Sequence, residues 1–244
     1  SKSLELIETS TSNLSNSKCA WGFRKMKDGK APEFAKQFTD PLDKFNAIYI
    51  GNSEEPRVYL TFDEGYENGY SNAILDTLKE KDVPAAFFVT MPYAKQNTDL
   101  IKRMIDEGHI VGNHTVNHYS MPDVSSDETV KQEIMGLHDY LKDNFNYEMS
   151  YFRPPKGEYS ERTLKLTNDL GYTTVMWSDA YADWDVNNQK GTEYAKDMIL
   201  NYMHNGCVLL LHAVSKDNAE VLGEAIDLLR EKGFEFYSLN EFHR

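Results

Sequence analysis

The chain has few cysteines, no long apolar segment and no excess of basic residues. Cys19 and Cys207 are its two cysteines, and they lie far apart in unlike contexts, so the chain is not a disulfide scaffold. A single bridge between them stays open, although a buried free thiol is the favoured interpretation of Cys207. The longest apolar run covers residues 206–214 and is too short to span a bilayer.

Acidic residues outnumber basic residues by 39 to 26, which gives a formal net charge of -13. This charge argues against binding nucleic acid through a general basic field. An anionic substrate would need local cations to hold it against the overall field. The sequence also shows no internal repeat and no glycine-rich phosphate loop.

The 40% share of hydrophobic residues supports a sizeable core, and the chain divides into two parts. Residues 1–45 open with small hydroxyl and amide side chains, which are typical of a flexible or surface-wrapped arm. Within the arm, Trp21 and Phe23 form an apolar island that we expect to dock onto the main domain at 46–244. The chain begins at Ser1 without Met, and we expect a leader or anchor to have been removed ahead of it.

Strand-like and helix-like segments alternate from Ala47 onward. The strand candidates are short apolar runs at 57–62, 85–89, 109–113, 150–153, 172–177, 207–212 and 234–238. Ser125 and Glu128 have the spacing of a helix capping box, and three helical segments each end at a glycine that can cap them, namely Gly108, Gly171 and Gly233. The alternation predicts a parallel α/β sheet, closed or nearly closed into a barrel. A doubly wound open sheet would give a similar pattern.

Two groups of polar residues suggest a metal-assisted hydrolase. Asp63 and Glu64 directly follow the first strand candidate, and as neighbours on an extended chain their side chains would point to opposite faces and could divide the roles of base and ligand. His114 and His118 would share a face if their segment made a helical turn, and imidazole suits zinc. Each pattern alone is more often incidental, because acidic pairs commonly lie solvated in turns. Together they indicate an open metal site.

Three further strand ends carry candidate site residues, and each of these residues could instead have a purely structural role. Arg153 opens an Arg-Pro-Pro-Lys-Gly loop that could be a rigid exposed turn or could hold a fixed planar donor. Asp183 and Trp184 follow another strand candidate, where solvated and core roles are more common. His212 ends the apolar run at 207–212 and needs a partner, and Asp183 could orient one of its ring nitrogens.

Five motifs, in their order along the chain, resemble those of the polysaccharide deacetylases, the NodB-homology domain of carbohydrate esterase family 4. They are Thr-Phe-Asp-Glu-Gly at 61–65, His-Thr-Val-Asn-His at 114–118, Arg-Pro-Pro-Lys-Gly at 153–157, Asp-Trp at 183–184 and Leu-Leu-His at 210–212. The resemblance implies a distorted (β/α)7 barrel with parallel strands and an N-terminal extension. It also implies hydrolysis of N-acetyl groups on sugars with a divalent metal, commonly Zn²⁺.

The resemblance assigns roles to the matching positions of this chain. Asp63 would be the general base, and Arg153 would position it. His212 would be the general acid, oriented by Asp183.

The remaining motif positions include two departures from the family pattern. His114 and His118 would be metal ligands, with Glu64 standing where the family has a third ligand, an aspartate. The extra methylene of Glu64 changes how it can reach a metal. Lys156 stands where many members have tyrosine; its backbone N–H matches the oxyanion donor of the family, and its side chain adds a cation.

The chain is most similar to the branch that leads to muramic δ-lactam in the spore cortex, through residues 21–23, 66–70 and 187–191. That branch deacetylates N-acetylmuramic acid after an N-acetylmuramoyl-L-alanine amidase has removed the peptide and exposed a lactyl carboxylate. We expect Lys156, aided by Lys190, to bind this carboxylate and Trp184 to contact the sugar.

Two alternatives stay open: a deacetylase of N-acetylglucosamine in peptidoglycan or chitin, and an inactive glycan-binding protein, which the replacement at Glu64 suggests. The expected partners are the peptidoglycan glycan strand and, in the same pathway, the amidase. Since cortex peptidoglycan lies outside the cytoplasmic membrane, the resemblance implies an extracytoplasmic protein, secreted or membrane-anchored, that faces the cortex of the developing spore.

Overall fold

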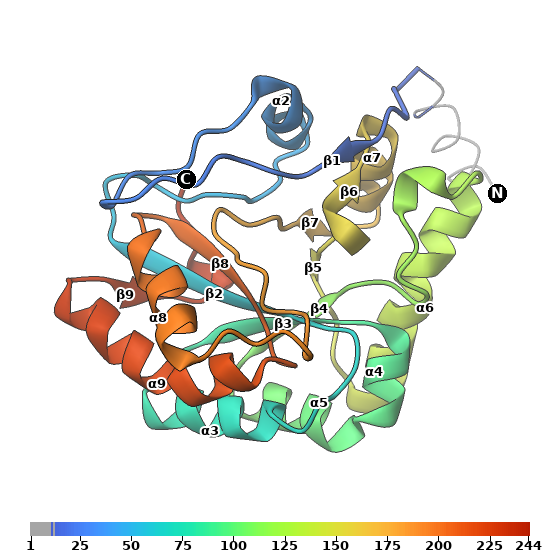
Figure 1. Ribbon diagram of the computed structural model, residues 1–244. Coiled ribbons are helices and arrows are strands. Elements are labelled where there is room, and N and C mark those ends of the chain that lie inside the picture. Colours follow the sequence, from blue (N-terminus) through green and yellow to red (C-terminus); the bar gives the residue numbers. More distant parts are fainter. Residues whose placement is uncertain (1–10, 12) are drawn as a thin grey trace. The chain divides into compact units, whose positions relative to one another are not determined.

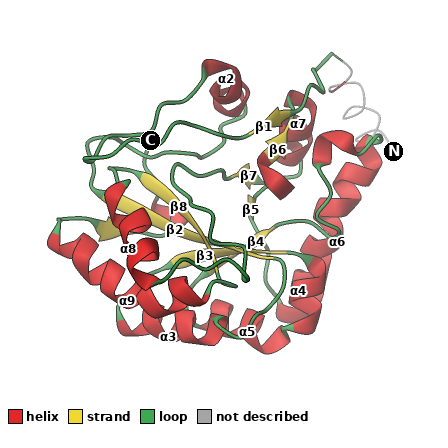
Figure 2. Ribbon diagram, in the orientation of Figure 1, coloured by secondary structure: helices red, strands yellow, loops and turns green. Residues whose placement is uncertain are grey.

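The computed structural model describes residues 11 and 13–244 (Figures 1 and 2). These residues divide into two compact units. The His114 unit comprises the described residues up to 23 together with 34–48 and 112–176, and the Asp63 unit comprises 24–33, 49–111 and 177–244. Strand β4 (Ile110–Asn113) starts in the Asp63 unit and ends in the His114 unit.

The Asp63 unit is built on β2 (Arg57–Glu64), whose residues 58–62 are all buried. Such a continuously buried, largely apolar run is typical of a parallel strand covered on both faces. The strands that pair with β2 all run parallel to it, and they are β3 (Ala85–Val89), β8 (Cys207–His212) and β9 (Glu235–Phe236).

Amphipathic helices cover this sheet. They are α3 (Ser71–Glu80), α4 (Met91–Gln96), α5 (Thr98–Asp106), α8 (Thr192–Asn201) and α9 (Lys216–Glu231). Helix α3 buries Ile74, Leu75 and Leu78, which recur at helical spacing. Helix α9 packs against both α3 and α8, and Figure 1 shows the three helices together.

The His114 unit combines short parallel strands with helices and the N-terminal arm. Its elements are β5 (Tyr151–Phe152), β7 (Thr173–Thr174), α2 (Lys36–Lys44), α6 (Asp127–Phe145) and α7 (Glu161–Asp169), and α6 packs against α7 (Figure 2). In the arm, β1 (Cys19–Ala20) pairs antiparallel with β6 (Glu158–Tyr159). Trp21 stacks on the ring of Phe34, another residue of the arm, at 5.4 Å between centroids, and the docking of the apolar island onto the main domain stays a prediction.

The secondary structure agrees with most sequence predictions. Each strand candidate overlaps an observed strand, and β3 and β8 match residue for residue. The three predicted glycine caps are left-handed, with φ of 83° at Gly108, 87° at Gly171 and 94° at Gly233. The predicted capping box is wrong by one position, because the side chain of Ser126, not Ser125, accepts the hydrogen bond from Thr129 N–H.

Other predictions concern the arm, the cysteines and membrane insertion. Residues 1–10 and 12 of the arm lie outside the described residues, and the boundary between 45 and 46 stays a prediction. Cys19 and Cys207 are both free thiols, and burial raises the pKa of Cys207 well above its ordinary value. No helix within residues 11 and 13–244 combines the length and apolarity needed to cross a membrane.

Candidate active site

Asp63 and His212 are neighbours at the carboxyl ends of two parallel strands. The register of β2 and β8 places Asp63 directly opposite His212. Registered neighbours in a parallel sheet point to the same face and lie about 5 Å apart. Both side chains are partly exposed. The Asp63 unit therefore presents a carboxylate and an imidazole together at one strand end.

Asp183 holds the ring of His212. Its buried carboxylate accepts from His212 Nδ1–H at 2.8 Å and from the backbone N–H of the same residue at 2.7 Å. Asn218, on α9, donates to the second oxygen of Asp183 at 2.7 Å, and the Tyr181 hydroxyl donates to Asn218. These bonds place a proton on Nδ1, so that proton exchange with a substrate would take place at Nε2 of His212.

Glu64 points into the unit, away from the face that carries Asp63. Its side chain is fully buried, with Oε1 3.2 Å from Ser71 Oγ, and Ser71 Oγ also donates to Glu67 at 2.6 Å. Among the residues that the structure describes, Oε2 of Glu64 has no hydrogen-bond partner. Burial, reinforced by the Glu67 charge, raises the pKa of Glu64 well above its ordinary value. Its role as a metal ligand stays a prediction.

In the His114 unit, a loop after β4 brings the two histidine rings together. His114 Nε2 lies 3.2 Å from His118 Nε2, and the ring centroids are 4.8 Å apart. The segment does not make a helical turn; it is an irregular bend in which Thr115 and His118 have φ of 74° and 58°. Left-handed backbone at two non-glycine residues is uncommon and costs about 1 kcal/mol or more each, so other contacts must hold it.

Glu133 and Asn113 supply those contacts, and sequence reasoning missed both. Glu133, buried on α6, accepts from the backbone N–H of Asn117 at 2.9 Å and from its side-chain amide at 2.6 Å. Asn113 Oδ1 accepts from Thr115 N–H at 2.9 Å. An isolated acid on a helix and an asparagine ending a strand carry no local signal of such a role.

The histidine pair fits a divalent metal. His114 Nδ1 donates to the carbonyl of Arg153 at 2.7 Å, so the lone pair of the neutral ring is on Nε2. Two ligand nitrogens of a tetrahedral zinc ion, each about 2.05 Å from it, would be about 3.3 Å apart, close to the 3.2 Å observed. Residues 11 and 13–244 do not assemble a cluster of three or more His, Cys, Asp or Glu side chains for a metal.

Arg153 and Lys156 lie on either side of the two prolines in the Arg-Pro-Pro-Lys-Gly loop, which belongs to the same unit. Arg153 is fully buried, and its guanidinium donates to the carbonyls of Val175 at 3.0 Å and Met176 at 2.9 Å. Its predicted role toward Asp63 stays a prediction. Lys156 is exposed, and its backbone is left-handed with φ of 62°.

The other predicted substrate contacts lie on one loop of the Asp63 unit. Trp184 is 60% exposed beside the buried Asp183, so it is not a core tryptophan. Lys190 is exposed, and its ammonium lies 5.0 Å from the centre of the Tyr194 ring.

The sequence profile of the polysaccharide deacetylase family matches residues 50–175, just over half of the chain. The chain belongs to this family. It is 43% identical over 222 residues to the peptidoglycan-N-acetylmuramic acid deacetylase PdaA of Bacillus subtilis, with 91% of this chain and 84% of that protein covered. It is 30% identical over 205 residues to a peptidoglycan-N-acetylglucosamine deacetylase of Bacillus cereus, with 81% and 72% covered.

The structural comparison agrees with this membership. The solved structure of Bacillus subtilis PdaA, a family 4 carbohydrate esterase, matches with a TM-score of 0.91 at 41% identity, and the match covers 94% of this chain and 98% of that one. The predicted fold class, a parallel α/β fold of the distorted (β/α)7 type, is therefore confirmed.

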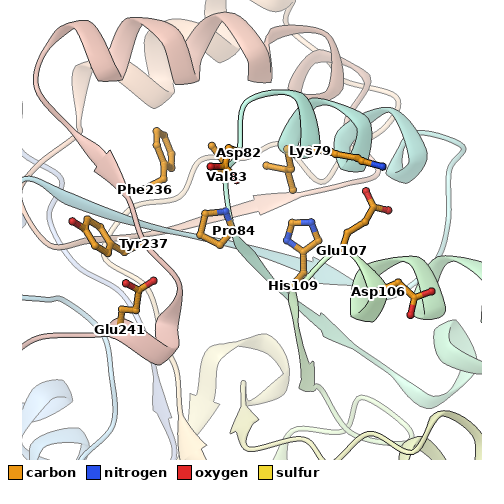
Figure 3. A pocket seen from close by; sticks show the side chains of 12 residues that line it. Lys79, Asp82, Val83, Pro84, Asp106, Glu107, His109, Phe236, Tyr237 and Glu241 are labelled. Atoms are coloured by element: carbon orange, nitrogen blue, oxygen red, sulfur yellow. The ribbon is translucent and has the colours of Figure 1, made fainter.

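A hollow at the other end of the strands contains none of the residues predicted for a polysaccharide deacetylase (Figure 3). Its volume is about 650 Å³, and its lining includes His109, Pro84 and Tyr237. His109 precedes β4 and accepts from Ala85 N–H at 3.1 Å, so this hollow lies at amino ends of strands. Barrel enzymes react at the carboxyl ends, where Asp63 and His212 lie.

Proposed function

We propose that this polysaccharide deacetylase removes the acetyl group from N-acetylmuramic acid in peptide-stripped peptidoglycan, leading to muramic δ-lactam in the spore cortex. The observation that carries the proposal is the pairing of Asp63 with a His212 whose tautomer is fixed by Asp183. The 43% identity to PdaA over most of both chains supports the choice of muramic acid.

The side chains supply the proton transfers that amide hydrolysis requires. In this mechanism, a carboxylate oxygen of Asp63 accepts the proton of the attacking water. His212, when it also carries a proton on Nε2, gives that proton to the leaving amine, and Asp183 stabilises the charged ring until the transfer. The side chain of His212 is 25% exposed, so a substrate amine can approach it.

Metal dependence is a property of this family, and zinc is our proposal for this chain. His114 and His118 would hold it through Nε2. When bound, such an ion lowers the pKa of water and polarises the acetyl carbonyl. Glu64 is the proposed third protein ligand, and its buried carboxyl would have to turn and ionise to serve.

Lys156 and Lys190 are the proposed partners of the lactyl carboxylate that peptide removal exposes, and Trp184 is the proposed wall against the sugar. All three side chains are exposed. Local ammonium groups are needed because the chain carries a net charge of -13. The amidase that removes the peptide is the proposed pathway partner, and an extracytoplasmic location, secreted or membrane-anchored and facing the cortex, follows from the substrate.

Mass spectrometry of peptide-stripped glycan incubated with the protein and zinc tests this function. We expect loss of acetyl from muramic acid, and none with Asp63→Asn. A further loss of water would show ring closure in the same reaction. Acetyl loss from chitin oligomers alone would replace the proposal by the N-acetylglucosamine activity. If neither the peptide-stripped glycan nor the chitin oligomers lost acetyl with any of several added metals, the protein would be an inactive glycan-binding protein.

A further inference from the structure

A hollow of about 480 Å³ in the His114 unit borders two of the predicted site residues. Its lining includes His118 and Lys156, together with Tyr119, Asp123, Val124 and Thr129. We call it the Tyr119 pocket. The residues beyond His118 and Lys156 have no role in the proposed reaction.

The chemistry of the Tyr119 pocket suits a sugar. Tyr119 lines the pocket and is 53% exposed, which leaves its ring open to stacking. Hydroxyl groups of Ser125 and Thr129 and the carboxylate of Asp123 also line the pocket, and they can pair with sugar hydroxyls. Lys156 is already assigned to the lactyl carboxylate of the reacting sugar, and Asp123 is paired with Lys18, so the rest of the lining suits a neutral sugar better than another lactyl-bearing one.

The N-terminal arm holds the wall of this pocket against the loop that carries Lys156. Lys18 Nζ bridges two carboxylates, lying 2.7 Å from Asp123 Oδ2 and 3.1 Å from Glu158 Oε2. Glu158 directly follows that loop and also accepts from Ser120 Oγ. The hydrogen bond from Ser120, with help from Lys18, lowers the pKa of Glu158, so this carboxylate stays charged.

Backbone contacts strengthen the same link. The pairing of β1 with β6 joins the arm to the residues that follow the loop, and Trp21 N–H donates to the carbonyl of Gly157 at 2.9 Å. Asn16 donates to the carbonyl of Pro122 at 2.9 Å, next to Asp123. The arm therefore contacts both the pocket wall and the loop, with Lys18 between them.

We propose that the Tyr119 pocket binds the sugar next to the one that loses its acetyl group, a neutral N-acetylhexosamine stacked on Tyr119, and that Lys18 positions the pocket wall. The inference rests on the proposed deacetylase function. It gives the arm a part in substrate selection and predicts that a glycan must extend beyond the reacting sugar for full affinity.

Steady-state rates on peptide-stripped glycans of increasing length test the pocket. Tyr119→Ala should raise KM about three- to tenfold on fragments long enough to fill it, as expected for loss of one aromatic stacking contact. It should leave kcat, and the kinetics on shorter fragments, unchanged, and Tyr119→Phe should behave as wild type. Tyr140→Ala, a partly exposed tyrosine on α6, is the matched control.

Lys18 is tested with the same substrates. Lys18→Met should reproduce the length-dependent rise in KM. Lys18→Arg should keep the wild-type KM, since arginine can bridge two carboxylates. A purely structural role would instead lower the free energy of unfolding in both variants and change kinetics at every length.

A titration of tyrosine-labelled protein with N-acetylglucosamine trimer, followed by NMR, separates this inference from the proposed function. A shift of the Tyr119 ring signal, absent with cellotriose, supports the pocket even if no acetate is released from any substrate. No shift at Tyr119 overturns it. Equal kinetics of Tyr119→Ala and Tyr140→Ala on every glycan length overturn it as well, even if deacetylation itself is established.

Discussion

Replacing Asp183 by asparagine should impair proton transfer at His212 and leave substrate binding intact. The carboxylate accepts three hydrogen bonds: the ring Nδ1–H and backbone N–H of His212, and the amide of Asn218. An asparagine of the same shape has one acceptor oxygen, so at least one of these donors would face an NH2 group. The charged ring of His212 would then lose a hydrogen bond worth about 1.5–3 kcal/mol.

That loss corresponds to a fall in kcat of about 10- to 150-fold, since each 1.36 kcal/mol added to the activation free energy of the reaction slows it by a factor of ten. We expect KM to change little, because Asp183 is only 1% exposed and cannot touch the glycan. The unpaired buried donor should also lower the free energy of unfolding by about 1–3 kcal/mol.

The assay is acetate release at saturating glycan, paired with urea unfolding of the same preparations. Asp143→Asn, at an exposed position on α6, controls for the change in net charge and should match wild type. A folded Asp183→Asn protein whose kcat lies within twofold of wild type would refute the assigned role of Asp183.

Three further predictions concern the metal, the substrate and pH. His118→Ala should weaken zinc binding at least tenfold in a chelator competition; unchanged affinity would remove His118 from the site. Lys156→Ala should lower kcat/KM on peptide-free muramic glycan about tenfold and on chitin oligomers less than twofold, and equal losses would contradict lactyl recognition. Burial raises the pKa of Asp179 from 3.8 to about 7, against the opposing charge of Lys25 at 3.0 Å. The native state then holds this proton more tightly than the unfolded state does. As the pH rises from about 4 to about 7, the free energy of unfolding should therefore fall by up to about 4 kcal/mol. Asp179→Asn should flatten that slope in urea titrations, and an unchanged slope would contradict the shift.

The strands were predictable where local sequence alone decides them. β3 and β8 are apolar runs buried on both faces, and their bounds match the prediction. β5 is shorter than predicted because Arg153 leads into Pro154, which has no N–H to donate to a sheet. The pairing of β1 with β6 was missed, because it joins segments about 140 residues apart through main-chain hydrogen bonds.

The site was predictable in its reacting residues and not in their supports. The histidine spacing and the strand-end acids have a recognisable pattern, but the left-handed backbone at Thr115 does not, since a β-branched residue rarely adopts it. Asn218 and Glu133 act through helices packed onto the loops. Their partners are distant in sequence, so only the tertiary structure reveals them.

The backbone at Lys156 has a consequence for attempts to make this protein more robust. A left-handed non-glycine residue costs about 1 kcal/mol, and glycine would adopt the same φ of 62° without that cost. A search for heat-resistant variants should therefore favour Lys156→Gly, which removes the ammonium proposed to recognise the substrate. Selection for thermal stability alone would produce a more stable protein that discriminates less well between glycans.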